Sequence, residues 1–477
     1  MPRNYTEPLH LLVPNAKRLH SRVSFVASYE YAAACLPTHA TGESSTCTVT
    51  LLSNSTASVE IHTFAGSTSL TLEAGETYLR SFEEDFFPIT GGENKAIRIV
   101  SDVALQVLVR KGPSYWNDVY VVPSEGGTLY FTTAFYYDRI CISNEVKQFY
   151  LISSIYNNTV VNITQQDGVI YELELPDFGT FVQTALDNED QLASGTKIVS
   201  SEPINVVSGN MCTYTGSTGS YGAYIADIPA VENLGTEYVA SKIMPESSSQ
   251  PGFSLSVVAT ADNTIVNSDG VVRILNEGQS TIFEYTGIDR SVIVNCSEIC
   301  LVAQYSKTDS PTYGLFMHSI LSEKALFTDA YFATVNLSTV SYLNLVLQGE
   351  APGENLYLNG SPLGNLSWTP TNGYTTAQLA IAQGIYELVS EDERQFAAYV
   401  YCHQASDGGA GYAVLPTSSL ISTPVPTVTT VSSTTLSPSV NSTLPQLTTR
   451  VNGTAVTSDG QDITPPCGVV SAICYLR

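Results

Sequence analysis

Acidic side chains are the residues of this sequence best suited to chemistry, and they gather in three short runs. The runs are Glu83-Glu84-Asp85, Asp187-Asn188-Glu189-Asp190 and Glu391-Asp392-Glu393. A glycosidase uses two such carboxylates that face each other across the substrate at a fixed separation. Each run equally fits a solvated acidic turn, because spacing along the chain does not show which carboxylates face each other. A carbohydrate-active hydrolase on a β-repeat scaffold therefore stays an alternative function.

Metal ligands and catalytic nucleophiles follow no recognisable pattern. The histidines are dispersed at His10, His20, His39, His62, His318 and His403. They form no HExxH motif and no pair with zinc-site spacing, and no GxSxG, Walker or GxGxxG sequence occurs. We therefore predict no catalytic residue, no cofactor and no metal ligand. Asp187 to Asp190, and Asp262-Asn263 with Asp269, offer oxygen ligands to Ca²⁺, but their spacing differs from that of an EF-hand loop.

The charge balance restricts the class of partner. The 477 residues carry a net charge of −25 with only 20 lysines and arginines. Nucleic-acid binding needs basic patches that neutralise phosphates, so it is excluded as an expectation, and anionic membrane surfaces are disfavoured. No run of about 20 apolar residues predicts a membrane span. A soluble extracellular protein, or one that attracts Ca²⁺ weakly, fits this composition better.

The nine cysteines include no CxxC pair, which disfavours zinc and thioredoxin-like sites. Cys35 and Cys47 flank a turn rich in Pro, Thr and Gly, and we expect them to form a disulfide. Cys296 and Cys300 flank a Ser-Glu turn between two predicted strands and are expected to close it. Scattered buried thiols are the alternative.

Sequons for N-glycosylation favour secretion because they are numerous. The candidates are Asn54, Asn157, Asn162, Asn295, Asn336, Asn365, Asn441 and Asn452. Two further sequons begin at Asn4 and at Asn359, and the latter is disfavoured by Pro362 directly after it. Residues 1–20 contain no apolar core of a signal peptide, so we expect the start to be incomplete.

Four copies of one pattern span the first 416 residues. Its anchor valines, Val100, Val199, Val294 and Val389, are 99, 95 and 95 residues apart. About 20 residues after each anchor comes a linking phrase, which we expect to carry the chain into the next copy. The linking phrases are Val121-Val122-Pro123, Asp227-Ile228-Pro229, Ile320-Leu321 and Val414-Leu415-Pro416. A repeat of this length is a domain-sized unit.

The elements that position these residues are predicted to be strands. Short alternating runs are separated by turn residues every 8–12 positions, which is typical of a β-sandwich. We predict an all-β fold of about four tandem β-sandwich-like modules of about 95–100 residues each, with closure into a ring as one arrangement. The expected ranges are 1–21 for an N-terminal arm and 22–135, 136–241, 242–332 and 333–416 for the modules.

The composition changes after residue 416. Ser and Thr make up 22 of the 50 residues from 417 to 466, which include no aromatic residue and no cysteine. Such a segment cannot bury a core, so we predict a disordered mucin-like linker, with a bare flexible tail as the alternative. Residues 467–477, with Cys467 and Cys474, are interpreted as a truncated or aberrant end.

Tyrosines are candidates for a recognition surface because they combine large contact area with a polar tip. The residues considered are Tyr136, Tyr137, Tyr214, Tyr221 and Tyr224. Burial in the core, or cross-strand pairing, is the alternative for each.

Several phrases resemble a known family. They are Val206-Val207-Ser208-Gly209-Asn210-Met211-Cys212, Asp227-Ile228-Pro229, Leu234-Gly235-Thr236-Glu237-Tyr238-Val239, Gly75-Glu76-Thr77 and Ser101-Asp102. Together they resemble the N-terminal domain of IgG Fc-binding proteins, over about residues 24–416. In that family the domain precedes von Willebrand D-type assemblies of secreted mucus proteins, and this chain has no cysteine-dense segment of that kind. The resemblance implies binding and identifies no Fc-contact residue.

These features predict a secreted, non-enzymatic binding or scaffold glycoprotein at mucus, matrix or cell surface. Its expected partner is a glycoprotein, a mucin or an immunoglobulin-like protein, bound multivalently because similar modules present similar faces. The alternatives are the hydrolase above and a structural adhesin that associates with itself.

Overall fold

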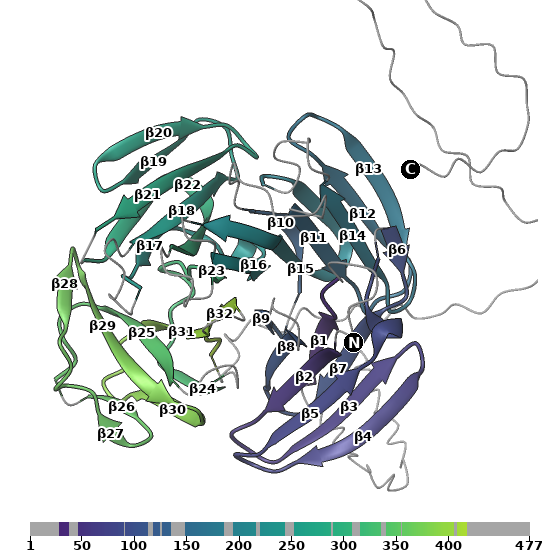
Figure 1. Ribbon diagram of the computed structural model, residues 1–477, viewed down its shortest axis with the longest axis horizontal. Coiled ribbons are helices and arrows are strands. Elements are labelled where there is room, and N and C mark those ends of the chain that lie inside the picture. Colours follow the sequence, from purple (N-terminus) through teal and green to yellow (C-terminus); the bar gives the residue numbers. More distant parts are fainter. Residues whose placement is uncertain are drawn as a thin grey trace, which may run out of the picture. The chain divides into compact units, whose positions relative to one another are not determined.

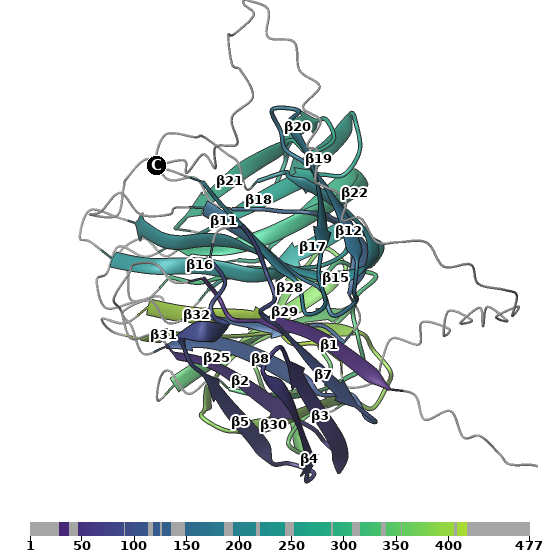
Figure 2. The same cartoon turned by 90° about the vertical axis from the view of Figure 1, so that its right-hand side faces the viewer.

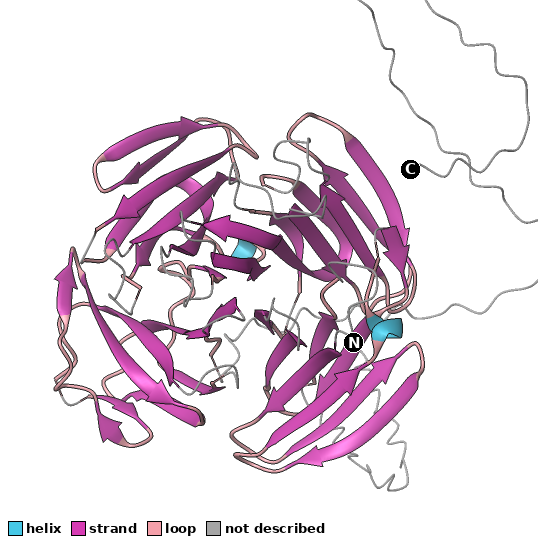
Figure 3. Ribbon diagram, viewed as in Figure 1, coloured by secondary structure: helices cyan, strands magenta, loops and turns pink. Residues whose placement is uncertain are grey.

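The structure is a computed structural model, and strands dominate it (Figure 3). The described residues are 28–37, 46–89, 91–112, 118–124, 126–134, 148–185, 194–215, 220–243, 252–287, 290–307, 315–334, 340–353, 355–404 and 408–416. The expected arm at 1–21, the mucin-like linker at 417–466 and the segment 467–477 lie outside them. None of the helices in the described ranges has the length and apolar character needed to cross a membrane. The predicted all-β fold is confirmed.

The strands form four successive modules (Figure 1). The first contains β1 (Tyr29–Ala34), β2 (Thr46–Leu52), β3 (Ala57–Thr63), β4 (Gly66–Leu72), β5 (Thr77–Phe82), the 3₁₀ turn η1 (Glu84–Phe86), β7 (Ala96–Ser101), β8 (Gln106–Gly112) and β9 (Asp118–Val122). The short strand β6 (Gly91–Glu93) precedes β7 in the chain but pairs with β14 of the second module. The second contains β10 (Gly127–Phe131), β11 (Gln148–Ser153), β12 (Thr159–Thr164), β13 (Ile170–Leu175), β14 (Thr180–Ala185), β15 (Lys197–Thr215) and β16 (Ser220–Ile228), followed by the 3₁₀ turn η2 (Val231–Asn233).

The third module contains β17 (Gly235–Ala240), β18 (Gly252–Ala259), β19 (Thr264–Ser268), β20 (Val271–Leu275), β21 (Ser280–Thr286), β22 (Val292–Lys307) and β23 (Met317–Ser319). The fourth contains β24 (Asp329–Ala333), β25 (Val340–Gln348), β26 (Leu356–Leu358), β27 (Ser361–Pro362), β28 (Thr369–Thr371), β29 (Tyr374–Ala382), β30 (Ile385–Ser390), β31 (Phe396–Gln404) and β32 (Gly408–Ala413).

One strand order recurs in all four modules. An outer sheet has the order β1-β7-β3-β4 in the first module, and its counterparts are β10-β15-β12-β13, β17-β22-β19-β20 and β24-β30-β26-β27. An inner sheet has the order β5-β2-β8-β9, and its counterparts are β14-β11-β15-β16, β21-β18-β22-β23 and β29-β25-β31-β32. The long strands β15 and β22 each belong to both sheets of their module. Each module is therefore a two-sheet β-sandwich, as predicted.

The sheets divide the chain earlier than the expected module boundaries. Strand β10 lies before residue 135 but pairs with β15, about 70 residues later, and so belongs to the second module. Strands β17 and β24 likewise open the third and fourth modules by pairing with β22 and β30. A linking phrase thus ends each module directly, and the strand after it starts the next.

The inner sheets are buried on both faces. In β11 all six residues are buried. Phe149 and Leu151 pack into the core of the first module, whereas Tyr150 and Ile152 pack inside the second. Continuous apolar runs are expected of strands covered on both sides. Each hydrophobic core consequently joins two neighbouring modules.

The last module packs against the first, which closes the ring. Leu108 and Val121 of the first module share a core with Leu343 and Leu345 of the fourth. The Ala333 N–H donates a hydrogen bond of 2.9 Å to Gln106 Oε1 across the same junction. Strands β9, β16, β23 and β32 contact one another and lie toward the centre of Figure 1. In the view turned by 90°, the strands of the first module form a group separate from β18–β22 (Figure 2).

A buried tyrosine on the first strand of three modules fixes the crossover between the two sheets. The hydroxyls of Tyr31, Tyr130 and Tyr238 donate to the carbonyls of Leu105, Ile204 and Cys300, respectively. Their strand partners are Ile99, Ile198 and Val294. Val294 is therefore equivalent to Ile99 and not to the anchor Val100, which corrects the sequence alignment by one residue. A one-residue shift reverses which face of a strand is buried, and accordingly Val199 is 38% exposed whereas Val294 is fully buried.

Tyr238→Phe is expected to lower the free energy of unfolding by about 1–2 kcal/mol, because it leaves the buried Gly235 N–H and Cys300 carbonyl without their shared partner. Chemical denaturation measures the change. Tyr171→Phe is the control, since Tyr171 is largely exposed, and it should be close to neutral. Equal effects of the two substitutions would contradict the role assigned to the Tyr238 hydroxyl.

Both expected disulfides are present among the described residues. Cys35 and Cys47 are bonded with their Cα atoms 5.6 Å apart, and Cys296 and Cys300 with theirs 6.4 Å apart. The first bond joins β1 and β2, which lie in opposite sheets of the first module. The second closes the crossover within β22 at the carbonyl that Tyr238 contacts. The disulfides thus tie the two sheets of the first and third modules together.

Candidate functional site

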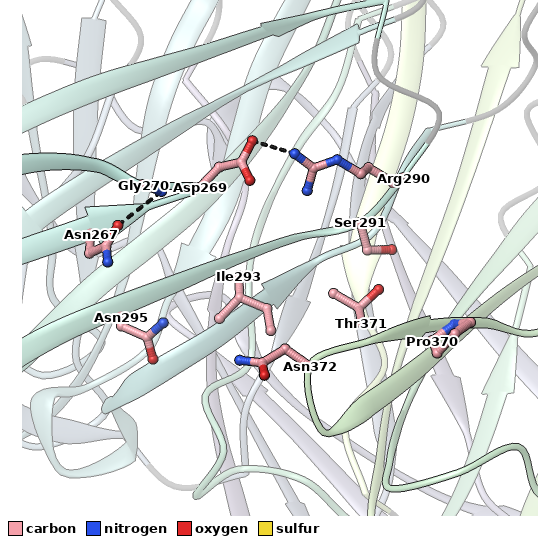
Figure 4. Close-up of a pocket in the computed structure, with 10 residues that line it drawn as sticks. All are labelled: Asn267, Asp269, Gly270, Arg290, Ser291, Ile293, Asn295, Pro370, Thr371 and Asn372. Carbon is pink, nitrogen blue, oxygen red and sulfur yellow. Dashed lines mark hydrogen bonds and ion pairs between the residues drawn. The ribbon is translucent and has the colours of Figure 1, made fainter.

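A polar groove lies between the third and fourth modules. It consists of adjoining cavities of about 370 and 220 Å³, which share Arg290 and Ser291 in their walls. Figure 4 shows the larger cavity. One wall is the exposed face of the outer sheet of the third module, with Asn267 on β19 and Asn295 on β22. The other wall is the hairpin β28–β29 of the fourth module.

Two tight turns shape the rim of the groove. Asp269-Gly270 joins β19 to β20, with φ angles of 53° and 83°. Asn372-Gly373 joins β28 to β29, with φ angles of 40° and 87°. Two-residue hairpin loops with positive φ at both positions favour Asn-Gly and Asp-Gly sequences. The local sequence therefore dictates where Asp269 and Asn372 stand.

Hydrogen bonds across the module boundary hold the floor of the groove in place. Ser291 Oγ and Thr376 Oγ1 lie 2.8 Å apart, and the Tyr374 hydroxyl donates to Glu237 Oε1 at 2.7 Å. Burial, followed by the bond to Glu237, raises the pKa of Tyr374, so its hydroxyl keeps its proton at neutral pH. The walls are thus fixed before any ligand arrives, which reduces the entropy lost on binding.

The groove offers hydrogen-bonding groups and one ion pair. Arg290 Nη2 lies 2.5 Å from Asp269 Oδ2, and this contact raises the pKa of Arg290 further. The Asn267 side chain accepts a hydrogen bond from the Gly270 N–H at 3.1 Å (Figure 4). Amide and hydroxyl groups beside a guanidinium suit a polar ligand such as a glycan or a peptide segment.

The two predicted acidic runs that the structure describes do not line this groove. Asp392 of the third run binds Arg394, which lowers the pKa of the Asp392 carboxyl. The second run lies outside the described residues, and Glu83 to Asp85 form the exposed turn around η1. Asp269 is the carboxylate among the described lining residues of the larger cavity. The described residues of that cavity therefore do not include the facing pair of carboxylates that the hydrolase hypothesis needs.

Asp262 and Asp269, the calcium candidates among the described carboxylates, have different partners. Asp262 accepts a hydrogen bond from the Glu277 N–H, whereas Asp269 pairs with Arg290 at the other end of β19. The described part of the chain contains no group of three acidic, histidine or cysteine side chains placed to hold a metal ion.

The sequons are distributed over the ring. Asn54, Asn157, Asn295 and Asn365 are exposed, and Asn162 is half-buried. Asn336, Asn441 and Asn452 lie outside the described residues. Asn295 lines the groove itself. A glycan attached there would change what the groove can bind.

Tyr224 is the tyrosine candidate whose side chain the structure describes, and it does not line the groove. Tyr224 is fully buried, and its hydroxyl donates to the Ser306 carbonyl at 2.6 Å, so it belongs to the core. Tyr136 and Tyr137, and the side chains of Tyr214 and Tyr221, lie outside what the structure describes. Sequence reasoning missed Arg290, Thr371 and Asn372. The Asp-Gly and Asn-Gly dipeptides could have predicted the two turns. They could not have predicted that the two turns lie close together.

Comparison with known proteins identifies a family for this chain. A family model described as IgGFc binding protein matches residues 106–402, from β8 to β31. A search of curated proteins finds no match. The matched region spans more than half of the chain and contains both walls of the groove. The chain therefore belongs to the IgGFc binding protein family.

Proposed function

We propose that this protein is an extracellular, non-enzymatic binding glycoprotein whose groove between the third and fourth modules recognises a glycoprotein or immunoglobulin-like partner. Its family is generally non-enzymatic and typically extracellular. The observation that carries the proposal is the preformed polar groove with the Arg290–Asp269 pair at its rim. Two disulfides and four exposed sequons support a secreted state.

We expect the partner to bind at this single groove, and not through weak contacts added over several similar modules. The groove depends on β28 and the Asn372-Gly373 turn of the fourth module, so the other junctions do not repeat its lining. In addition, each core spans two modules, so a single module cannot serve as an independent binding unit. The whole ring is the unit that we expect to bind.

Partner binding is measured on the full chain, produced through a secretory pathway and immobilised. The panel contains IgG Fc, mucin glycoproteins and a glycan array, each with and without Ca²⁺. We expect saturable binding to at least one member. If the folded, disulfide-bonded protein bound no member of the panel, the proposal would be contradicted and the self-associating adhesin would be favoured.

Arg290→Ala is expected to weaken binding of the identified partner about tenfold, because it removes the guanidinium shared by both cavities and leaves Asp269 unpaired. The matched control is Arg273→Ala on β20, an exposed arginine of the same module that bonds the Val272 carbonyl away from the groove. Binding curves by biolayer interferometry compare the two. A loss of equal size in both variants would place the contact outside the groove.

A further inference from the structure

A second cavity, here called the hub cavity, lies where the four linking phrases meet. It measures about 200 Å³. Each phrase contributes to its wall, through Pro123, Pro229, Leu321 and Pro416 respectively. Most of the wall is apolar, with further contributions from Ile228, Ile320 and Leu415. The phrases that only connect modules in the sequence thus form an apolar chamber at the junction of the inner strands.

Asp227 introduces a carboxylate into this chamber. Counted back from the proline of each linking phrase, the corresponding residues of the first and fourth modules are Val121 and Val414, and both are buried. Valine therefore satisfies the structural requirement at this position. Asp227 is half-buried, and a carboxylate beside apolar walls favours a ligand that can pair with its charge.

Among the described residues, no side chain pairs with the Asp227 carboxylate. Its hydrogen bond comes from its own backbone N–H. Its charge acts on Tyr120 and Tyr130, whose hydroxyls donate to the carbonyls of Ala34 and Ile204. No lysine, arginine or histidine is among the described lining residues of the cavity. The described wall of the cavity thus offers no cationic side chain to the Asp227 carboxylate.

We propose that the hub cavity binds a small organic cation, a primary amine on a compact apolar body, whose ammonium group pairs with Asp227. The apolar walls bury the body of the ligand, and the ammonium supplies the charge and the hydrogen-bond donors that the carboxylate lacks. A neutral ligand of the same shape would bury the carboxylate further without pairing it. This site is separate from the groove and does not depend on the proposed partner.

Binding of the amine should depend on pH. Burial in the cavity wall raises the pKa of Asp227 to about 7. The facing groups are Tyr120 and Tyr130, whose pKa values burial also raises so that both stay neutral, and Glu232, which lies near Tyr130. An ammonium ion needs the ionised carboxylate, which predominates at pH 8 and is scarce at pH 5.5. The amine itself stays charged at both values.

Calorimetric titration of the full chain tests the site with cyclohexylmethylamine and the matched neutral alcohol, cyclohexylmethanol. At pH 8 we expect the amine to bind at least tenfold more tightly than the alcohol, and at pH 5.5 to lose at least tenfold in affinity. The Asp227→Asn variant should bind the amine no more tightly than the alcohol. Its affinity for the alcohol should be unchanged, which would show that the cavity is still formed. Asp262→Asn, an exposed carboxylate of the third module, should change neither ligand.

Three results would overturn the proposal: equal affinity of the two ligands for the unmodified protein, amine binding that survives Asp227→Asn, or no binding of either ligand at millimolar concentration. The last result would show that the hub cavity is too closed to be a binding site. The pH dependence on the unmodified protein serves as a second measurement if Asp227→Asn fails to fold.

Discussion

Phe149→Ala is expected to lower the free energy of unfolding of the whole ring by about 3–5 kcal/mol. Phe149 lies in the second module, but its fully buried side chain packs in the core of the first. The substitution opens a cavity in a core that belongs to both modules. Because every core is shared in this way, we expect the four modules to unfold in one transition and not one after another.

The two tryptophans allow this cooperativity to be observed. In a Trp116→Phe background the remaining one is Trp368, which lies in the fourth module and donates to the Leu363 carbonyl at 3.1 Å. Denaturation followed by Trp368 fluorescence should therefore shift to lower denaturant when Phe149 is truncated. Ile170→Ala is the matched control, since Ile170 is a 69% exposed residue of the second module. An unshifted Trp368 transition would show that the modules unfold independently.

Asp227→Asn is expected to stabilise the protein by about 2–3 kcal/mol at pH 8 and to have little effect at pH 4. Burial raises the pKa of Asp227 to about 7, well above its value in an unfolded chain. The folded state therefore binds this proton more tightly. The stability that the group contributes is fully present below the unfolded pKa and is lost as pH rises from about 4 to about 7. The amide of asparagine does not ionise, so the variant keeps that stability.

Thermal and chemical denaturation between pH 4 and pH 8 measure the difference between the two proteins. Asp392→Asn is the control of opposite sign, because Arg394 lowers the pKa of Asp392 and the stability from that pair is lost as pH falls. If Asp227→Asn showed the same offset at every pH, a packing effect and not ionisation would account for it.

The hub cavity and the groove have different origins in the sequence. The groove is built from hairpin turns, Asp269-Gly270 and Asn372-Gly373, whose geometry is encoded locally. The hub cavity is built from linking phrases about 92–106 residues apart, which have no local reason to meet. Closure of the ring brings them together, through the contact of the first module with the fourth. Variants that weaken that contact should therefore affect the hub cavity before they affect the groove.

The sequence by itself determined the all-β class, the number of modules and the two disulfides. The alternation of strands, the turn residues and the cysteine spacing are patterns of a few neighbouring positions. They can therefore be recognised in the sequence without knowledge of the fold. The phrases around Cys212 and Tyr238 also pointed to the family that the comparison then showed. The repeat was visible because each module uses the same strand order.

Tertiary structure decided the rest. It assigned β10, β17 and β24 to the modules that follow them, because each pairs with a strand that comes tens of residues later. It showed that Val294 is equivalent to Ile99, one residue before the anchor Val100. An alignment of the sequence cannot resolve this shift, because the neighbouring positions are also apolar. It also brought Arg290 and Thr371 into the walls of one groove, and the four linking phrases into the wall of the hub cavity with Asp227. Such proximity depends on pairing and packing over long separations, which the local sequence does not encode.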